Sequence, residues 1–365
     1  MTTICLCMIV KDEVPVIERC LRSALPLVDI AVIVDTGSTD DTYDKMTPFD
    51  ENPVPVDVHF RPWVNFSHNR NEAITIAKES VPEVDYLLFL DADEVLTVPE
   101  GFKWPELTAD AYWLPVDYGG THYLRCALVK SSFEMRYVGA VHEYLELPEG
   151  TVIERLDAPT IRVFHDGARA RDPQTYAKDA ALLLEAHRKD PADARTVFYL
   201  AQSHRDAGKP FAARDWYLKR AAMGGWAEEQ WMALYEAAKL TEIDDPEMAV
   251  NYYLRAYQMR PARAEPLYQL ARLFRGRRDW HVAWMFAMAA SHVMMPVGER
   301  LFLDPSIYKW RIHDEIGILG FYAGHPGMGQ VAAEYALANC PPEERERIAA
   351  NRAFYDAPAA HLRST

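Results

Sequence analysis

The sequence lacks the features that mark several classes of protein. It contains no run of about 18 apolar residues, which a membrane-spanning helix would need. Its first residues have no basic segment ahead of the apolar stretch, so we expect a buried strand there rather than a signal peptide. Its five cysteines show no CxxC spacing and indicate neither a disulfide framework nor a structural zinc site. These absences favour a soluble, cytoplasmic protein that does not contact a membrane.

Positive charge is scarce in the first half of the chain only. Residues 1–165 hold 28 acidic and 13 basic side chains, whereas residues 166–365 hold 26 of each. Nonspecific nucleic-acid binding requires cations that neutralise phosphates, so the acidity of the first half argues against it. The neutral second half does not exclude a specific nucleic-acid acceptor.

Two domains are expected from the length of 365 residues, which exceeds what one hydrophobic core usually organises. Apolar runs alternate with helical patterns over residues 1–168, which is typical of an α/β domain with a mixed, mostly parallel sheet. Residues 169–365 show helical patterns alone, so we expect an all-α domain there. The predicted strands of the first domain are 4–10, 30–34, 54–60, 84–90, 111–117, 123–129 and 151–163. Its predicted helices are 14–25, a short helix that begins at residues 39–42, and 67–78, the last capped by Ser67.

The helical half of the sequence repeats itself. Alanines recur beside aromatic residues at intervals of 37 and 33 residues in one series, and of 36 and 34 residues in another. These intervals bracket the period of about 34 residues that tetratricopeptide helix pairs show. Such pairs usually stack into a concave face, so we expect the repeats to hold a protein or peptide partner. The first series is Ala201, Ala238 and Ala271, and the second is Ala213, Ala249 and Ala283.

Two carboxylates follow the apolar run at 84–90. Strands buried on both faces carry ligands at their carboxyl ends, and residues two apart point the same way in an extended chain. Asp91 and Asp93 would then face one hard cation, Mn²⁺ or Mg²⁺, which would hold a diphosphate. The alternative is that these residues only start a turn or cap a helix.

A second strand end carries polar groups of another kind. The run from Val32 to Asp40 ends a strand in a carboxylate, a glycine turn and the start of a helix. Glycine permits close approach of the backbone, and the amides at a helix amino terminus favour phosphate or ribose oxygens. This turn therefore predicts a nucleotide site, although many ordinary strand-to-helix turns contain the same residue types.

Together these motifs resemble the family 2 glycosyltransferases. The resemblance rests on Cys7 to Glu13, on Val34 to Asp40 and on the Asp91-Ala92-Asp93 motif. Other residues, followed by the repeats, resemble the branch that includes peptide S-glycosyltransferases. These residues are Trp63, Phe66, Arg70, Asn71, Glu94, Val141, His142, Glu143, His165 and Gly167.

The resemblance implies a GT-A fold and a metal-dependent transfer of a hexose, with inversion, from a nucleotide-diphosphate sugar. It implies Asp91, Asp93 and His165 as metal ligands, although His165 is equally suited to a structural hydrogen bond at a domain boundary. It implies Glu143 as the base that takes the acceptor's proton, with His142 orienting or replacing it. The residues expected at the nucleotide sugar are Val10, Lys11, Glu13, Asp35, Thr36, Gly37, Ser38, Arg70, Asp91, Ala92 and Glu94.

The nucleotide turn departs from the Asp-Asp-Gly-Ser pattern that many family members carry. Thr36 stands where the second Asp would contact the base, so the resemblance does not determine the nucleotide. We expect a protein or peptide acceptor, held by the repeats, and the carboxyl-terminal helices are candidates for a homodimer interface. The alternatives are the same chemistry on a glycan, a small molecule or a modified nucleic-acid base, or a catalytically silent interaction scaffold.

Overall fold

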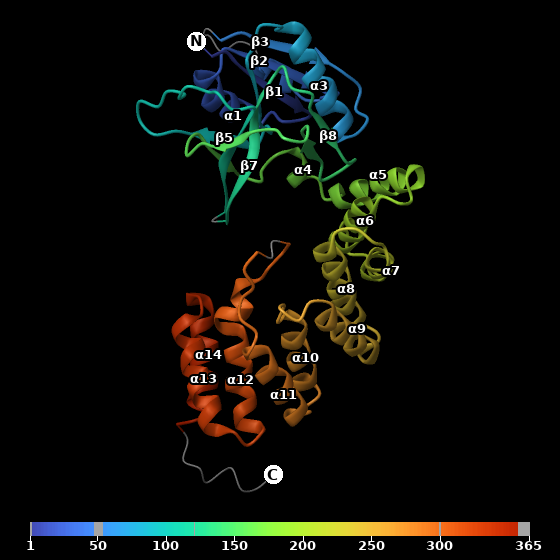
Figure 1. Ribbon diagram of the computed structural model, residues 1–365, viewed down its shortest axis with the longest axis vertical. Helices are drawn as coiled ribbons and strands as arrows, with labels where there is room; N and C mark the ends of the chain where they lie inside the picture. Colours follow the sequence, from blue (N-terminus) through green and yellow to red (C-terminus); the bar gives the residue numbers. More distant parts are fainter. Residues whose placement is uncertain (1, 47–53, 120, 299–300, 357–365) are drawn as a thin grey trace. The chain divides into compact units, whose positions relative to one another are not determined.

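The computed structural model describes residues 2–46, 54–119, 121–298 and 301–356 (Figure 1). It divides into two compact units, Met1–Asp190 and Pro191–Thr365. This division falls later in the chain than residue 168, because helices α4 (Ala168–Arg171) and α5 (Thr175–Lys189) are grouped with the first unit. Within the described part of the chain, no helix has the length and apolarity needed to cross a bilayer.

The first unit is built on a curled sheet of mixed direction. In the described residues it has nine strands, eight of them in the order β3-β2-β1-β4-β7-β6-β11-β5, and β10 pairs with β6. Strands β3, β2, β1 and β4 run parallel, whereas β7 is antiparallel to both β4 and β6. The strands are β1 (Ile4–Val10), β2 (Ile30–Asp35), β3 (Val56–Phe60), β4 (Tyr86–Phe89), β5 (Glu94–Thr97), β6 (Ala111–Tyr118), β7 (Thr121–Lys130), β10 (Ile153–Arg155) and β11 (Thr160–Val163).

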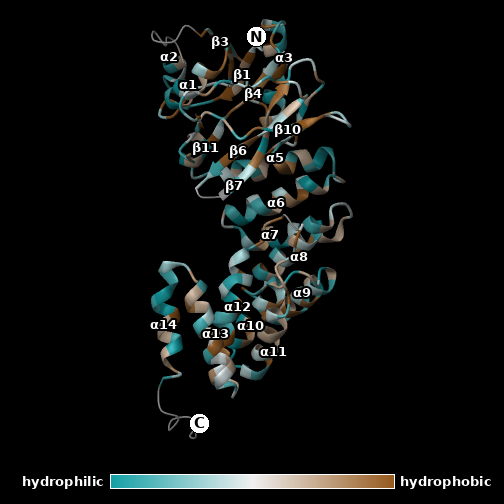
Figure 2. Cartoon of the chain, turned by 60° about the vertical axis from the view of Figure 1, so that its left-hand side comes forward, coloured by the Kyte–Doolittle hydropathy of each residue, from teal (hydrophilic) through white to brown (hydrophobic). Residues whose placement is uncertain are grey.

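Both faces of the central strands are buried, as the continuous apolar runs predict. Leu6 packs in the core formed with helix α1 (Ile17–Ala24), and its neighbour Cys7 packs in the core formed with helix α3 (Phe66–Ser80). Side chains alternate across a strand, so the two helices cover opposite faces of the sheet. These strands are among the most hydrophobic segments of the chain (Figure 2).

Helix α3 begins differently from the prediction. Asn65 precedes the helix, and its side-chain oxygen accepts a hydrogen bond from the backbone nitrogen of His68 at 2.8 Å. The prediction of Ser67 as the cap is wrong: Ser67 lies inside the first turn and donates to Asn65 Oδ1 at 3.1 Å. Asparagine is as good a capping residue as serine, so the sequence alone did not separate the two.

Several short elements were not predicted. The expected strand at 151–163 is interrupted and forms β10 and β11. The sequence does not predict the four-residue strand β5, nor the two-stranded sheet of β8 (Arg136–Val138) and β9 (Tyr144–Glu146). The short helix α2 (Thr42–Met46) follows β2, where the sequence predicts a short helix beginning at residues 39–42.

The second unit consists of antiparallel helix pairs. The alanines of both series are fully buried, and each pair from α6–α7 to α10–α11 contributes one alanine of each series. The prediction of tetratricopeptide-like repeats is confirmed. The helices are α6 (Ala194–Asp206), α7 (Pro210–Ala222), α8 (Ala227–Thr241), α9 (Pro246–Met259), α10 (Glu265–Gly276), α11 (Trp280–Ser291), α12 (Ile312–Tyr322), α13 (Pro326–Asn339) and α14 (Arg345–Ala353).

The pair α12–α13 is packed through glycines. A Cβ atom on Gly320 would lie 2.5 Å from the Cα atom of Gly329 on the facing helix. A Cβ atom on Gly317 would lie 3.0 Å from the Cβ of Ala333. The two helices therefore approach each other with their backbones nearly in contact.

Candidate active site

The two sequence motifs meet at one edge of the sheet. Strands β1, β2 and β4 are parallel neighbours, so the loops that follow them lie at the same edge. These loops carry the residues around Glu13, the turn at 35–40 and the turn at 91–93. Binding sites of open α/β sheets form outside the carboxyl ends of the strands, and this edge is therefore the candidate site.

The predicted nucleotide turn is shaped by its own polar side chains. Asp35 Oδ1 accepts hydrogen bonds from the backbone nitrogens of Gly37 at 2.9 Å and Ser38 at 2.7 Å. Thr36 is buried, and its backbone nitrogen and hydroxyl both donate to the carbonyl of Val10, at 2.9 and 3.1 Å. Asp35 and Thr36 therefore hold the turn in place, and nucleotide contact by their side chains stays a prediction.

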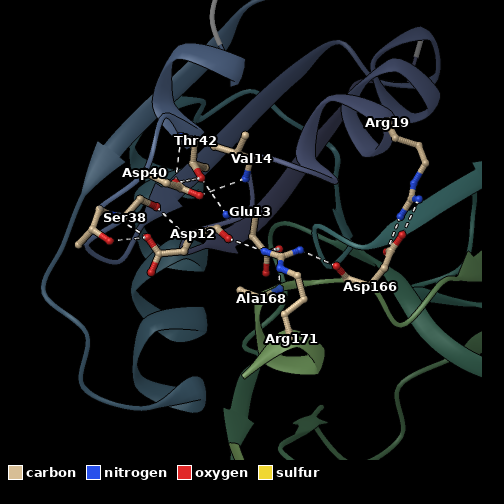
Figure 3. Close-up of polar contacts among 11 residues, drawn as sticks. Asp12, Glu13, Val14, Arg19, Ser38, Asp40, Thr42, Asp166, Ala168 and Arg171 are labelled. Carbon is tan, nitrogen blue, oxygen red and sulfur yellow. Dashed lines mark hydrogen bonds and ion pairs between the residues drawn. The ribbon is translucent and has the colours of Figure 1, made fainter. Parts of the chain in front are cut away.

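The loops after β1 and β2 are joined by side-chain hydrogen bonds (Figure 3). The backbone nitrogen of Asp12 donates to Ser38 Oγ at 3.0 Å, and that of Glu13 donates to Thr42 Oγ1 at 2.8 Å. In return, the backbone nitrogen of Thr39 donates to Asp12 Oδ1 at 2.6 Å. The two loops thus form one rigid wall of the site.

A third segment, following β11, joins this wall (Figure 3). Glu13 Oε2 accepts a hydrogen bond from the backbone nitrogen of Ala168 at 2.9 Å and lies 3.9 Å from Arg171 Nη2. The Asp166 carboxylate accepts hydrogen bonds from both terminal nitrogens of Arg19, at 2.8 and 2.7 Å. The backbone carbonyl of Asp166 accepts a hydrogen bond from Arg171 Nη1 at 2.6 Å. The segment that carries His165 is therefore fixed against the loop after β1.

Glu13 has an altered acidity in this position. Burial raises its pKa to about 7, and the charges of Asp93 and Asp91 act in the same direction. The hydrogen bond from Ala168 and the charge of Arg171 oppose this shift without cancelling it. Glu13 therefore lies near enough to Asp91 and Asp93 to be affected by their charges, and its contact with the nucleotide sugar stays a prediction.

The Asp-Ala-Asp motif forms a tight turn and not an extended chain. The backbone nitrogen of Glu94 donates to the carbonyl of Asp91 at 3.1 Å, and β5 begins at Glu94. The predicted geometry, with both carboxylates aligned by strand alternation, is therefore wrong. Burial raises the pKa of Asp93, and the charge of Asp91 raises it further, so the turn still brings two carboxylates into mutual repulsion.

Glu94 is buried and engaged in an ion pair. Its oxygens accept from Arg125 Nη1 at 2.7 Å and Nη2 at 2.6 Å, and Oε2 also accepts from the backbone nitrogen of Asp91 at 2.9 Å. These contacts fix the position of the acidic turn. The expected contact of Glu94 with the donor stays a prediction, and Arg125 is a residue that sequence reasoning missed.

The first carboxylate of the motif and the predicted base share one arginine. Arg70 Nη2 donates to Asp91 Oδ1 at 2.5 Å, and Arg70 Nε donates to Glu143 Oε1 at 2.7 Å. Burial works to raise the pKa of Asp91, but the positive charges of Arg70 and Arg125 outweigh it and hold that pKa below its ordinary value. Asp91 and Glu143, far apart in the sequence, therefore lie in one site.

The loop that carries Glu143 is held by the same helix. Asn71 Nδ2 donates to the carbonyl of Tyr137 at 2.9 Å, and the backbone nitrogen of Tyr137 donates to Asn71 Oδ1 at 2.7 Å. The chain then turns at Gly139 and His142, which have φ values of 108° and 54°. The imidazole of His142 lies at an exposed position beside Glu143.

Asp91 and Asp93 are the residues that could hold a divalent cation. In the described residues, no group of three or more His, Cys, Asp or Glu side chains is arranged as a complete metal site. His165 is exposed, and its ring packs edge-on against Tyr118 with 4.5 Å between ring centroids. The two repelling carboxylates offer the oxygen donors that Mn²⁺ and Mg²⁺ prefer, and both ions commonly complete their shell with phosphate and water.

The other predicted donor-site residues differ in exposure. Lys11, at the end of β1, is exposed, whereas Val10 and Ala92 are buried and can offer only backbone groups to a ligand. Gly37 is exposed at a φ value of 103°, a conformation that favours glycine.

Comparison with known proteins agrees with this architecture. Residues 5–100 match the sequence model of Glycosyl transferase family 2. A TPR repeat-containing protein of Synechococcus elongatus is 38% identical over 108 residues. This match covers 29% of the present chain and 24% of that protein, so the chain spans about a quarter of its relative's length.

Solved structures are also similar to part of the chain. A crystal structure of MamA is 17% identical, with a TM-score of 0.38, over 47% of this chain and 91% of that one. BtubC from P. vanneervenii is 16% identical, with a TM-score of 0.40, over 52% and 84%. A tetratricopeptide repeat protein from Parabacteroides merdae is 19% identical, with a TM-score of 0.38, over 50% and 66%.

The matched region contains β1, β2, α3 and the acidic turn after β4, which form part of the candidate site, whereas Glu143 and the segment after β11 lie outside it. The first unit therefore carries a region, residues 5–100, that matches glycosyl transferase family 2, and tetratricopeptide-like helical repeats make up the second unit.

Proposed function

We propose that this protein is an inverting, metal-dependent glycosyltransferase that moves a hexose from a nucleotide-diphosphate sugar to a protein or peptide. The observation that carries the proposal is the meeting of Asp91, Asp93 and Glu143 at the edge where β1, β2 and β4 end. A carboxylate pair for a cation and a third carboxylate for a proton are what an inverting transfer requires.

The donor's nucleotide would lie against the turn after β2, and its diphosphate would lie near the turn after β4. Asp91 and Asp93, with His165 from the segment after β11, are the residues that would hold the cation. When bound, this cation would stabilise the negative charge of the departing diphosphate. The backbone amides around Gly37 supply further donors to the nucleotide.

Glu143 would act on the acceptor. Its carboxylate takes the proton from the acceptor's hydroxyl, thiol or amide as that heteroatom bonds to the anomeric carbon. The bond between the anomeric carbon and the diphosphate oxygen breaks, and its electron pair leaves with the nucleoside diphosphate. Attack from the face opposite the leaving group inverts the configuration of the sugar.

The acceptor would be selected by the helical repeats. Stacked helix pairs with small residues at their contacts usually form surfaces for peptides and proteins. The six buried alanines show that this chain has the corresponding packing. A protein or peptide is therefore the acceptor class that fits the second unit.

Donor binding is tested by thermal unfolding with a panel of nucleoside diphosphates, each with and without Mn²⁺. A ligand at 100 times its Kd stabilises the folded protein by about 2.7 kcal/mol, so a metal-dependent rise in Tm is expected for at least one base. Asp93→Asn should abolish the rise. Indifference of the wild type to every nucleotide with Mn²⁺ would refute the donor site.

Transfer itself is tested by mass spectrometry of proteins co-expressed with the chain. We expect peptides that carry an added hexose, and we expect them to disappear with Glu143→Gln. A Glu143→Gln variant that still modifies the same peptides would remove Glu143 from the role of base.

A further inference from the structure

One guanidinium connects the donor side of the site with the acceptor side. Arg70 Nη2 donates a hydrogen bond to Asp91 Oδ1 at 2.5 Å, and Arg70 Nε donates one to Glu143 Oε1 at 2.7 Å. The side chains of Arg70 and Glu143 are only 13% and 12% exposed, whereas that of Asp91 is 40% exposed. Arg70 thus lies beneath the site, and Asp91 faces outward.

The position of Glu143 depends on this contact. Asn71 holds the backbone of the preceding strand through Tyr137, but that contact does not reach the Glu143 side chain. The planar, permanently charged guanidinium fixes the direction of a bound carboxylate, which a flexible lysine ammonium does not. Arg70 also separates two carboxylates that would otherwise repel each other.

We propose that Arg70 is a positioning residue for the base and not a ligand of the donor's phosphates. The inference rests on the proposed transferase function and gives Arg70 a different role from the expected contact with the nucleotide sugar. Two of its guanidinium nitrogens, Nη2 and Nε, already bind protein carboxylates. Through them, Arg70 sets the location of the base relative to the turn that binds the donor.

The proposed role predicts a separation between binding and turnover. Removing the side chain frees Glu143 to rotate away from the acceptor, so kcat falls by more than donor affinity, which changes only through the lost contact with Asp91. A positioned base contributes about 100-fold or more to the rate, and this is the loss in kcat that we expect for Arg70→Ala. A phosphate ligand would instead weaken donor binding.

The test measures donor affinity by calorimetry with nucleoside diphosphate and Mn²⁺, and kcat with a peptide acceptor identified by mass spectrometry. Arg70→Ala should lose about 100-fold in kcat, and its loss of nucleotide affinity should be clearly smaller than this. Millimolar guanidinium ion should restore part of that kcat in Arg70→Ala and none in Glu143→Gln. Arg70→Lys should lie between Arg70→Ala and the wild type.

Arg136→Gln is the matched control, because Arg136 forms an exposed pair with Glu146 on the neighbouring two-stranded sheet. It should leave both quantities unchanged. Circular dichroism checks that each variant is folded, and Arg70→Lys, which retains the charge, serves if Arg70→Ala unfolds.

Two results would overturn the inference about Arg70 without affecting the proposed function. One is a loss of nucleotide affinity in Arg70→Ala that matches the loss of transfer. The other is an unchanged kcat in both Arg70 variants. Absence of nucleotide binding by the wild type would instead overturn the proposed donor site, and this role of Arg70 with it.

Discussion

Gly167 lies directly against the carboxylate of Asp93. A Cβ atom at Gly167 would be 3.2 Å from Asp93 Oδ2 and 3.3 Å from Asp93 Cγ. The contact joins the segment after β11 to the turn after β4. The missing side chain at position 167 therefore helps to set the position of the second acidic residue of the motif.

Gly167→Ala should displace the Asp93 carboxylate by a few tenths of an ångström. Residues that orient metal ligands typically affect metal affinity by about 10- to 100-fold, so we expect a loss near the lower end for Mn²⁺ in the presence of nucleotide. Calorimetric titration measures it. Gly224→Ala, where a Cβ atom meets nothing within 4 Å, should be without effect. Equal affinities in both variants would show that this contact does not matter for binding.

Glu13 should give the protein's stability a defined pH dependence. Burial, chiefly, raises its pKa from the ordinary value of 4.5 to about 7. The folded state therefore holds the proton more tightly than the unfolded state. The resulting stabilisation is complete below pH 4.5 and is lost as the pH rises through 7.

Glu13→Gln tests this dependence, because the amide oxygen can still accept from Ala168 while the charge is absent. The Tm of the variant minus that of the wild type should be larger at pH 8 than at pH 5. The exposed residue Glu149 provides the control Glu149→Gln, which should follow the wild type at both values. A constant difference in Tm between Glu13→Gln and the wild type would contradict the shifted pKa.

Arg125→Met should destabilise the first unit strongly. The Glu94 side chain is 3% exposed and receives two hydrogen bonds from Arg125. Removing one partner of a buried ion pair costs about 3–5 kcal/mol, because the remaining charge is left without compensation. The double variant Glu94→Gln/Arg125→Met should lose less. Chemical unfolding of the three proteins gives the comparison, and equal losses in the single and double variants would argue against a buried charge as the cause.

Gly320→Ala should loosen the α12–α13 pair. The added methyl group would overlap with Gly329, and forcing an extra carbon into a packed contact costs about 1–3 kcal/mol. Hydrogen exchange should show faster exchange in α12 and α13, with α6 and α7 unchanged. Gly327→Ala, in the same pair but with open space around its Cβ, should be neutral or slightly stabilising.

The strand-end motifs could be predicted from sequence because an apolar run followed by polar residues marks the end of a buried parallel strand. The repeats could be predicted because the small residues at helix contacts recur at a constant interval. The short strands β8 and β9 could not, since three residues are too few to show an alternating pattern.

The ion-pair partners of the site's side chains could not be predicted from the local sequence. Arg125 lies on β7 opposite Leu114, and a charged residue within an apolar strand was the one available signal that it has a buried partner. Its pairing with Glu94, and the sharing of Arg70 by two carboxylates, depend on how β7 and α3 are placed in the fold. The geometry of the acidic turn was mispredicted because strand β5 follows it so closely.

The two hydrogen bonds between Asn71 and the backbone of Tyr137 bear on how such enzymes diversify. They attach β8, which precedes the loop that carries Glu143, to α3, so its location does not depend on the length of the chain between the acidic turn and β8. Insertions or deletions in the β6–β7 hairpin can then change the surroundings of the site while Glu143 keeps its position beside Arg70 and Asp91.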